Sequence, residues 1–211
     1  NELNNLGVRV ARLEDRVGNV KVTGDMRLRY RDAEHESSKF DGRARLQFNA
    51  KVNDRTDAVV RLTTGNFEFG NATANTTVKF DRAFVNHKFG EHVSVEAGRF
   101  GQMLGAGLAY DDTFDGVQFN AGNEKINFQA AYGYALEGVN NVGRDNNAEL
   151  AVVNLNGKVG KHTNVGGFYT RVNGEDLQLG GKAVKNIYGF NADANFDKVW
   201  VGGEWLKASN V

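Results

Sequence analysis

Residues 20–31 read Val-Lys-Val-Thr-Gly-Asp-Met-Arg-Leu-Arg-Tyr-Arg, and this stretch decides the fold. Apolar side chains recur at alternate positions from Val20 to Tyr30, and the positions between are mostly charged. A period of two is typical of a β-strand, so one face is apolar and the other is cationic. Residues 40–52 repeat the pattern. The two stretches predict a pair of long antiparallel strands joined by a loop.

Two interpretations of such strands remain open at this point. In a soluble sandwich the apolar face covers a dry core and the arginines face bulk water. In a membrane barrel the apolar face meets lipid and the arginines line a wet lumen. Soluble strands usually have about 5 or 6 residues, whereas a tilted membrane-spanning strand needs roughly 9–11. Both stretches reach the longer figure, and the rest of the chain favours the membrane interpretation further.

The composition limits the class of protein. The chain has 211 residues, 26 basic and 26 acidic, and contains neither cysteine nor proline. The lack of cysteine excludes a disulfide scaffold and thiol chemistry, and the balanced charge argues against nucleic acid as a partner. The mean hydropathy is −0.50. Such a value suits a soluble protein, but also a barrel in which every second residue faces water.

In residues 1–18 the apolar residues recur with a different period from those in the rest of the chain. Apolar residues recur at spacings of three and four, which predicts a helix with a coiled-coil seam flanked by an arginine and a glutamate. The alternatives are a trimeric coil and a single amphipathic helix lying on the barrel mouth, and we favour the trimer. The predicted trimerisation residues are Leu3, Leu6, Arg9, Val10, Leu13, Glu14 and Val17.

Residues 19–211 predict a series of hairpins. Short polar connections alternate with long ones, which lie near 31–39, 66–77, 101–114, 135–147 and 173–185. The strands are expected near 20–31, 40–52, 57–66, 78–90, 92–100, 115–122, 125–134, 148–159, 162–172, 186–196 and 198–207. Alternating short turns and long loops are typical of an outer-membrane barrel, and aromatic residues near strand ends fit its interfacial girdles.

The expected fold class is therefore all-β, an antiparallel transmembrane β-barrel with a short N-terminal α-helical coiled coil. Eleven strands are an odd number, whereas bacterial single-chain barrels close with an even one. We expect residues 19–211 to be part of a porin-like barrel that lacks its C-terminal part and has about 16 strands when complete.

The order of parts resembles the OmpM-type porins of diderm Firmicutes. The resemblance rests on the heptad coil and on Gly18 to Asp25 leading into an arginine-bearing strand. Residues 81–90 followed by 95–100 also look like the strand–turn–strand unit of larger porins. The resemblance to OmpM-type porins implies a homotrimer in the outer membrane, with the coil on the periplasmic side. It also implies that wall polymer or peptidoglycan is bound only through an S-layer-homology domain, which is absent from this sequence.

A charge filter is expected inside the channel. The candidate pore-lining residues are Arg27, Arg29, Arg43, Arg45, Arg61 and Arg82. In trimeric porins a loop at the place of 101–114 folds inward and narrows the lumen, so the resemblance assigns a constriction role to Asp111, Asp112 and Asp115. The alternative is an external loop with solvated acids. Opposed charges across a narrow wet gap would select solutes by charge.

Catalytic and metal-binding motifs are not found in this sequence. The acids lack the closing glutamate of a calcium loop, and Gly105-Ala106-Gly107 lacks the lysine of a phosphate loop. The four histidines show no ligand spacing, and there is no Gly-x-Ser-x-Gly elbow. We therefore expect no enzyme activity, no metal and no cofactor.

The sequence predicts a passive outer-membrane porin through which small hydrophilic solutes and ions diffuse, with membrane lipid around it. Two other functions stay open. One is a structural tether between outer membrane and cell wall with little pore activity. The other is a soluble β-sandwich binding protein.

Overall fold

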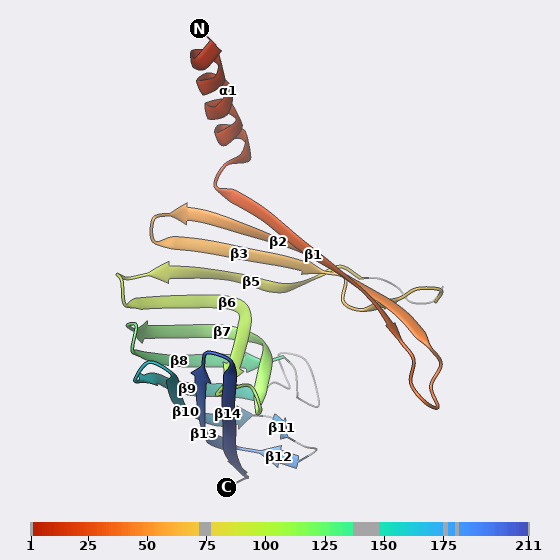
Figure 1. The fold of residues 1–211 in the computed structure, drawn as a ribbon, viewed down its shortest axis with the longest axis vertical. Coiled ribbons are helices and arrows are strands. Elements are labelled where there is room, and N and C mark those ends of the chain that lie inside the picture. The colour runs from red at the N-terminus through yellow and green to blue at the C-terminus, as the bar shows by residue number, and fades with distance from the viewer. Residues whose placement is uncertain (1, 72–76, 137–147, 175–176, 180–181, 211) are drawn as a thin grey trace. The chain divides into compact units, whose positions relative to one another are not determined.

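The structure is a computed structural model, and it describes residues 2–71, 77–136, 148–174, 177–179 and 182–210. The chain divides into two compact units, residues 1–83 and 84–211. Figure 1 shows that one helix precedes a run of strands. The all-β antiparallel fold expected from the sequence is confirmed.

The first unit begins with helix α1 (Glu2–Val17), as the heptad pattern predicts. All side chains described between residues 2 and 12 are exposed. The seam residue Leu3 is 85% exposed and Leu6 is 58% exposed. Leu13, Glu14 and Val17 lie in the helix, but their side chains are outside the described part of the chain. Trimer formation by this helix stays a prediction.

Strands β1 (Val20–Arg31), β2 (Lys39–Asn53) and β3 (Thr56–Thr63) pair in that order as antiparallel neighbours, and the short β4 (Phe67–Glu68) pairs with β2. Strand β5 (Lys79–Lys88) crosses the division between the units. The long connection predicted at 66–77 therefore carries a short strand; its residues 72–76 lie outside the described part.

The second unit contains β6 (Val93–Leu104), β7 (Tyr110–Gly122), β8 (Ile126–Ala135), β9 (Ala148–Val159), β10 (Thr163–Gly174), β13 (Asn186–Phe196) and β14 (Val199–Ser209). These strands pair antiparallel in chain order. Strands β11 (Leu177–Leu179) and β12 (Lys182–Val184) form a separate ribbon within the predicted connection 173–185. All eleven predicted strands are thus present among the described residues, and β1, β9 and β13 have the predicted ends.

Both faces of the second unit carry apolar side chains, and those on one face are exposed. One face, which we call the outer face, carries exposed apolar side chains such as Val117, Leu155 and Trp205, each more than half exposed. The opposite inner face carries the buried cluster, including Phe100, Phe114, Phe168 and Ile187, together with buried amides. Strand alternation places consecutive residues on opposite faces, so every strand contributes to both.

The connection predicted over 101–114 is wrong in extent. Strand β6 continues to Leu104 and β7 starts at Tyr110, so the hairpin tip is residues 105–109 only. The glycines and aspartates here are typical of a loop. The strands continue nonetheless because Phe100, Leu104 and Phe114 keep the alternation and bury their side chains in the core cluster.

Candidate functional site

Strands β1, β2 and β3 of the first unit present one charged face. The register sets Asp25 opposite Arg45, Arg27 opposite Arg43, and Arg29 opposite Asp41. Arg61 on β3 lies opposite Gln47, on the same face. The other face of β1 is apolar and exposed, with Met26 at 66% and Leu28 at 55%. Five of the six predicted pore-lining arginines are therefore brought together on one wall.

Aspartates on the same wall bind these arginines, which the sequence analysis did not foresee. Asp41 receives hydrogen bonds from both Arg29 and Arg31, and its own side chain is only 5% exposed. Asp25 bonds Arg45 at 2.9 Å and lies 3.9 Å from Arg43. The wall is therefore a network of alternating charges rather than a row of unopposed arginines.

The remaining three arginines of the prediction have different partners. Arg27 donates to the side-chain oxygen of Asn66 at 2.6 Å. Arg61 forms a two-pronged ion pair with Asp81 of β5, with bonds of 2.9 and 2.7 Å. Arg82, also on β5, donates to the backbone carbonyl of Asp81 at 2.7 Å. Sequence reasoning could have found the contacts with Asp81, because this aspartate lies on a strand that is predicted next to an arginine-bearing strand.

The predicted constriction acids are strand residues, which corrects their assignment to a loop. Asp111, Asp112 and Asp115 all lie on β7. Asp115 pairs with Arg99 across the ladder, with bonds of 2.7 and 2.8 Å. Asp111 and Asp112 are exposed. The glycines at 101, 105 and 107 suggested a loop, but β6 and β7 stay paired up to Leu104 and Tyr110.

The hairpin tip of β6 and β7, residues 105–109, is held by a distant carboxylate. The backbone N–H groups of Ala106 and Leu108 donate to the two oxygens of Glu204 on β14, both at 3.1 Å. The amide of Asn154 on β9 donates to the carbonyl of Met103 at 3.3 Å. Figure 1 shows β6 bending out of line with its neighbours near its end. The tip therefore crosses the inner face of the second unit.

Gly105 marks the closest approach of the tip to that face. Its φ is +60°, a left-handed conformation that favours glycine. A Cβ at this position would come within 2.8 Å of the Phe168 ring and would overlap Glu204. Sequence reasoning missed Glu204 because its partners are backbone groups almost a hundred residues away, and no local pattern encodes that contact.

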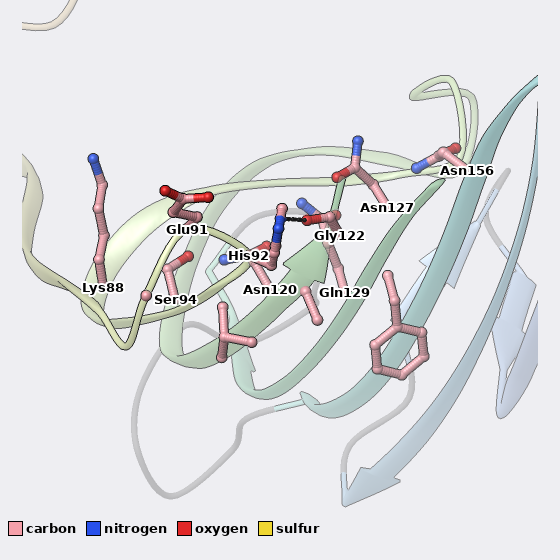
Figure 2. Close-up of a pocket in the computed structure, with 13 residues that line it drawn as sticks. Lys88, Glu91, His92, Ser94, Asn120, Gly122, Asn127, Gln129 and Asn156 are labelled. Carbon is pink, nitrogen blue, oxygen red and sulfur yellow. Dashed lines mark hydrogen bonds between the residues drawn. The ribbon is translucent and has the colours of Figure 1, made fainter. Parts of the chain in front are cut away.

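Towards the short turns the inner face changes from apolar to polar. Six amide side chains lie on three adjacent strands: Gln118 and Asn120 on β7, Asn127 and Gln129 on β8, and Asn154 and Asn156 on β9. We call this set the amide wall. Figure 2 shows Asn120, Asn127, Gln129 and Asn156 around a cavity beside the turn that bears His92. Its volume is about 400 Å³.

At the opposite strand ends, the outer face carries a polar belt. Beside the Arg99–Asp115 pair, Tyr132 donates to Glu149 at 2.6 Å, and Tyr169 donates to Asn186 at 2.9 Å. The apolar stretch of β8 from 126 to 134 spans about 26 Å along the strand, or roughly 20 Å at a tilt of about 40°. That height is close to the apolar band of outer-membrane barrels, about 25 Å.

The described residues contain no group of three histidines or acids that would hold a metal ion. No helix among them is long and apolar enough to cross a membrane.

Comparison with known proteins identifies a family for this chain. A family model with the description "Putative porin" matches residues 10–154, which is more than half of the chain. The match runs from the middle of α1 to β9 and so includes the charged face, the hairpin tip and most of the amide wall. No curated protein matches the chain.

Proposed function

The chain belongs to this porin family, and from that premise we propose that it forms a water-filled channel in the outer membrane. Small hydrophilic solutes and ions diffuse through the channel down their gradients, without chemistry or a cofactor. The outer face meets lipid and the inner face meets water.

The observation that carries this proposal is the exposed apolar outer face of the sheet. Trp205 is 53% exposed and Leu155 is 52% exposed, whereas the polar Asn154 and Gln118 are 3% and 6% exposed on the opposite face. Contiguous exposed apolar patches of this kind mark contact with lipid or protein. In an outer-membrane barrel they form the lipid-facing band.

Two features would filter solutes. The charged face of the first unit carries more arginines than the aspartates that bind them, which favours anions near that wall. The hairpin tip, docked on the inner face by Glu204, would narrow the channel. The hairpin tip would then select solutes by size, and the charged face would select them by charge.

The finer assignments follow the resemblance to OmpM-type porins. Strand β1 pairs only with β2, and β14 only with β13, among the described residues. Open edges do not persist in lipid, so we propose that further strands complete a barrel of about 16 strands. The exposed seam of α1 would join three copies on the periplasmic side. Wall tethering would need a further domain.

A second function is favoured by one observation. The inner face beneath the hairpin tip is apolar and closely packed, with Leu104 and Leu150 fully buried. A barrel filled in this way would serve as a structural tether between membrane and wall, with little conductance.

Conductance in a planar lipid bilayer distinguishes the two functions. The full-length protein, inserted from detergent, should give steady steps in potassium chloride, and threefold grouping of the steps would support the trimer. Insertion without steady current would favour the tether. Protein that stays dispersed without detergent and never inserts would instead support a soluble binding protein.

A further inference from the structure

The amide wall is continuous across three strands of the second unit. The register sets Asn120 opposite Gln129, Gln129 opposite Asn154, and Asn127 opposite Asn156. Ser94 on β6 extends the row, since it lies opposite Asn120. The wall is therefore a single polar surface with a fixed two-dimensional spacing, not a set of scattered side chains.

The wall borders a cavity of ligand size. The cavity of about 400 Å³ is lined by Ser94 and by four of the amides, and Figure 2 shows those amides grouped around it. Small-molecule sites usually measure about 300–1,000 Å³. The charged residues Lys88 and Glu91 lie at the rim, in or beside the short turn. The cavity is thus polar but largely uncharged at its floor.

Two side chains of the wall each have a buried carbonyl oxygen that accepts no hydrogen bond among the described residues. Gln118 donates to Asn120 at 3.1 Å, yet its own carbonyl oxygen Oε1 is buried with no donor among the described residues. The carbonyl oxygen Oδ1 of Asn154 is in the same condition. Buried polar atoms are normally paired. Neither residue lines the cavity, so a solute there would contact Asn120, Asn127, Gln129 and Asn156 instead.

The chemistry of a fitting ligand follows from the amides. An amide presents a donor and an acceptor together and has no net charge. A hydroxyl group has the same dual capacity, whereas an ionised carboxylate or phosphate offers only acceptors and leaves the oxygens of the lining amides without a donor. The wall suits uncharged, hydroxyl-rich molecules better than anions, in contrast to the arginine-rich face of the first unit.

We propose that the amide wall is a weak binding site for uncharged, hydroxyl-rich solutes of the saccharide class, which it holds briefly during passage. This inference rests on the proposed channel function. It adds a solute class that the charge pattern of the first unit does not predict.

The test uses the full-length protein in a planar bilayer with a neutral trisaccharide as the probe. The trisaccharide should reduce the current in a saturable manner. Polyethylene glycol of matched size, which has almost no donors, should reduce it only in proportion to the volume it occupies. The double substitution Asn127→Ala and Asn156→Ala should weaken saccharide binding by about 5- to 30-fold, the loss expected for two neutral hydrogen bonds. Lys161→Ala, in the neighbouring turn, is the matched control and should leave it unchanged.

The outcomes separate this proposal from the channel function. Equal effects of saccharide and glycol, unaltered by the double substitution, would overturn the amide site while leaving the channel intact. If no current is seen, the channel proposal fails, and a calorimetric titration of the detergent-solubilised protein with the trisaccharide decides the site alone. If the double variant does not fold, saccharide binding is measured instead on the more conservative Asn156→Gln variant.

Discussion

Replacing Glu204 with alanine removes the carboxylate that holds the hairpin tip. The tip then loses two hydrogen bonds, from the N–H groups of Ala106 and Leu108, each 3.1 Å long. A net contribution of about 0.5–1.5 kcal/mol for each bond gives roughly 1–2 kcal/mol for the partly exposed pair. Since about 1.4 kcal/mol is a factor of ten, the undocked population should rise by about 5- to 30-fold.

Cysteine labelling measures this population directly. The chain has no cysteine, so Gln102→Cys introduces a single thiol, on β6 at a position that is 3% exposed while the hairpin is docked. Reaction with a membrane-impermeant maleimide then follows transient opening, and its rate is proportional to the undocked fraction when closing is fast. The Glu204→Ala variant should react about 5- to 30-fold faster, and Glu204→Gln, which keeps one acceptor, should be intermediate.

Lys207→Ala, an exposed position on the same strand, is the matched control and should label at the parent rate. If the Gln102→Cys protein reacts at the same rate with and without Glu204→Ala, the reasoning is refuted. In that case the packing of Leu104 and Phe100 against the inner face, rather than the carboxylate, holds the tip.

Three further predictions test the other surfaces. Gly105→Ala should also raise the labelling rate of Gln102→Cys, because a Cβ there overlaps Glu204 and the Phe168 ring; an unchanged rate would mean that the tip tolerates a side chain. Asp41→Asn should shift the reversal potential in a salt gradient further towards anions, since Arg29 and Arg31 lose a shared carboxylate. Val153→Arg on the outer face should cost about 2–4 kcal/mol of stability in lipid, measured by denaturant titration, whereas Asn156→Arg on the inner face should fold normally. Equal stability of these last two variants would count against a lipid-facing outer face.

The strand pattern was readable from sequence wherever side chains alternate without interruption. β1 and β13 begin and end as predicted, and β9 does as well. The faces of β10 were not readable, because Gly166 and Gly167 lack the side chains that would mark alternation. Phe80 and Val85 on β5 are both exposed although they are five positions apart, so exposure along β5 does not follow strict alternation.

The site was only partly predictable, for a different reason. The arginines of β1 to β3 share a face because alternation fixes it, and sequence alone gives that. Their neutralisation by Asp25 and Asp41 depends on cross-strand register. Alternation does not fix that register, because a shift of two residues keeps every side chain on its face but changes its partner. The contact between Glu204 and the hairpin tip depends on the curvature of the sheet, which no local pattern specifies.

The location of the acids changes how the filter would work. Loop acids opposed to arginines would have combined size and charge selection in one structure. Instead the hairpin tip, residues 105–109, carries no charged side chain, and the acids that neutralise arginines lie on strands. The two kinds of selection should therefore be separable by mutation. Gly105→Ala, which perturbs the tip without changing its charge, should change the largest solute that passes while leaving the reversal potential unaltered, and Asp41→Asn should do the opposite. If both substitutions change both properties, the hairpin and the charged wall act on solutes at one place.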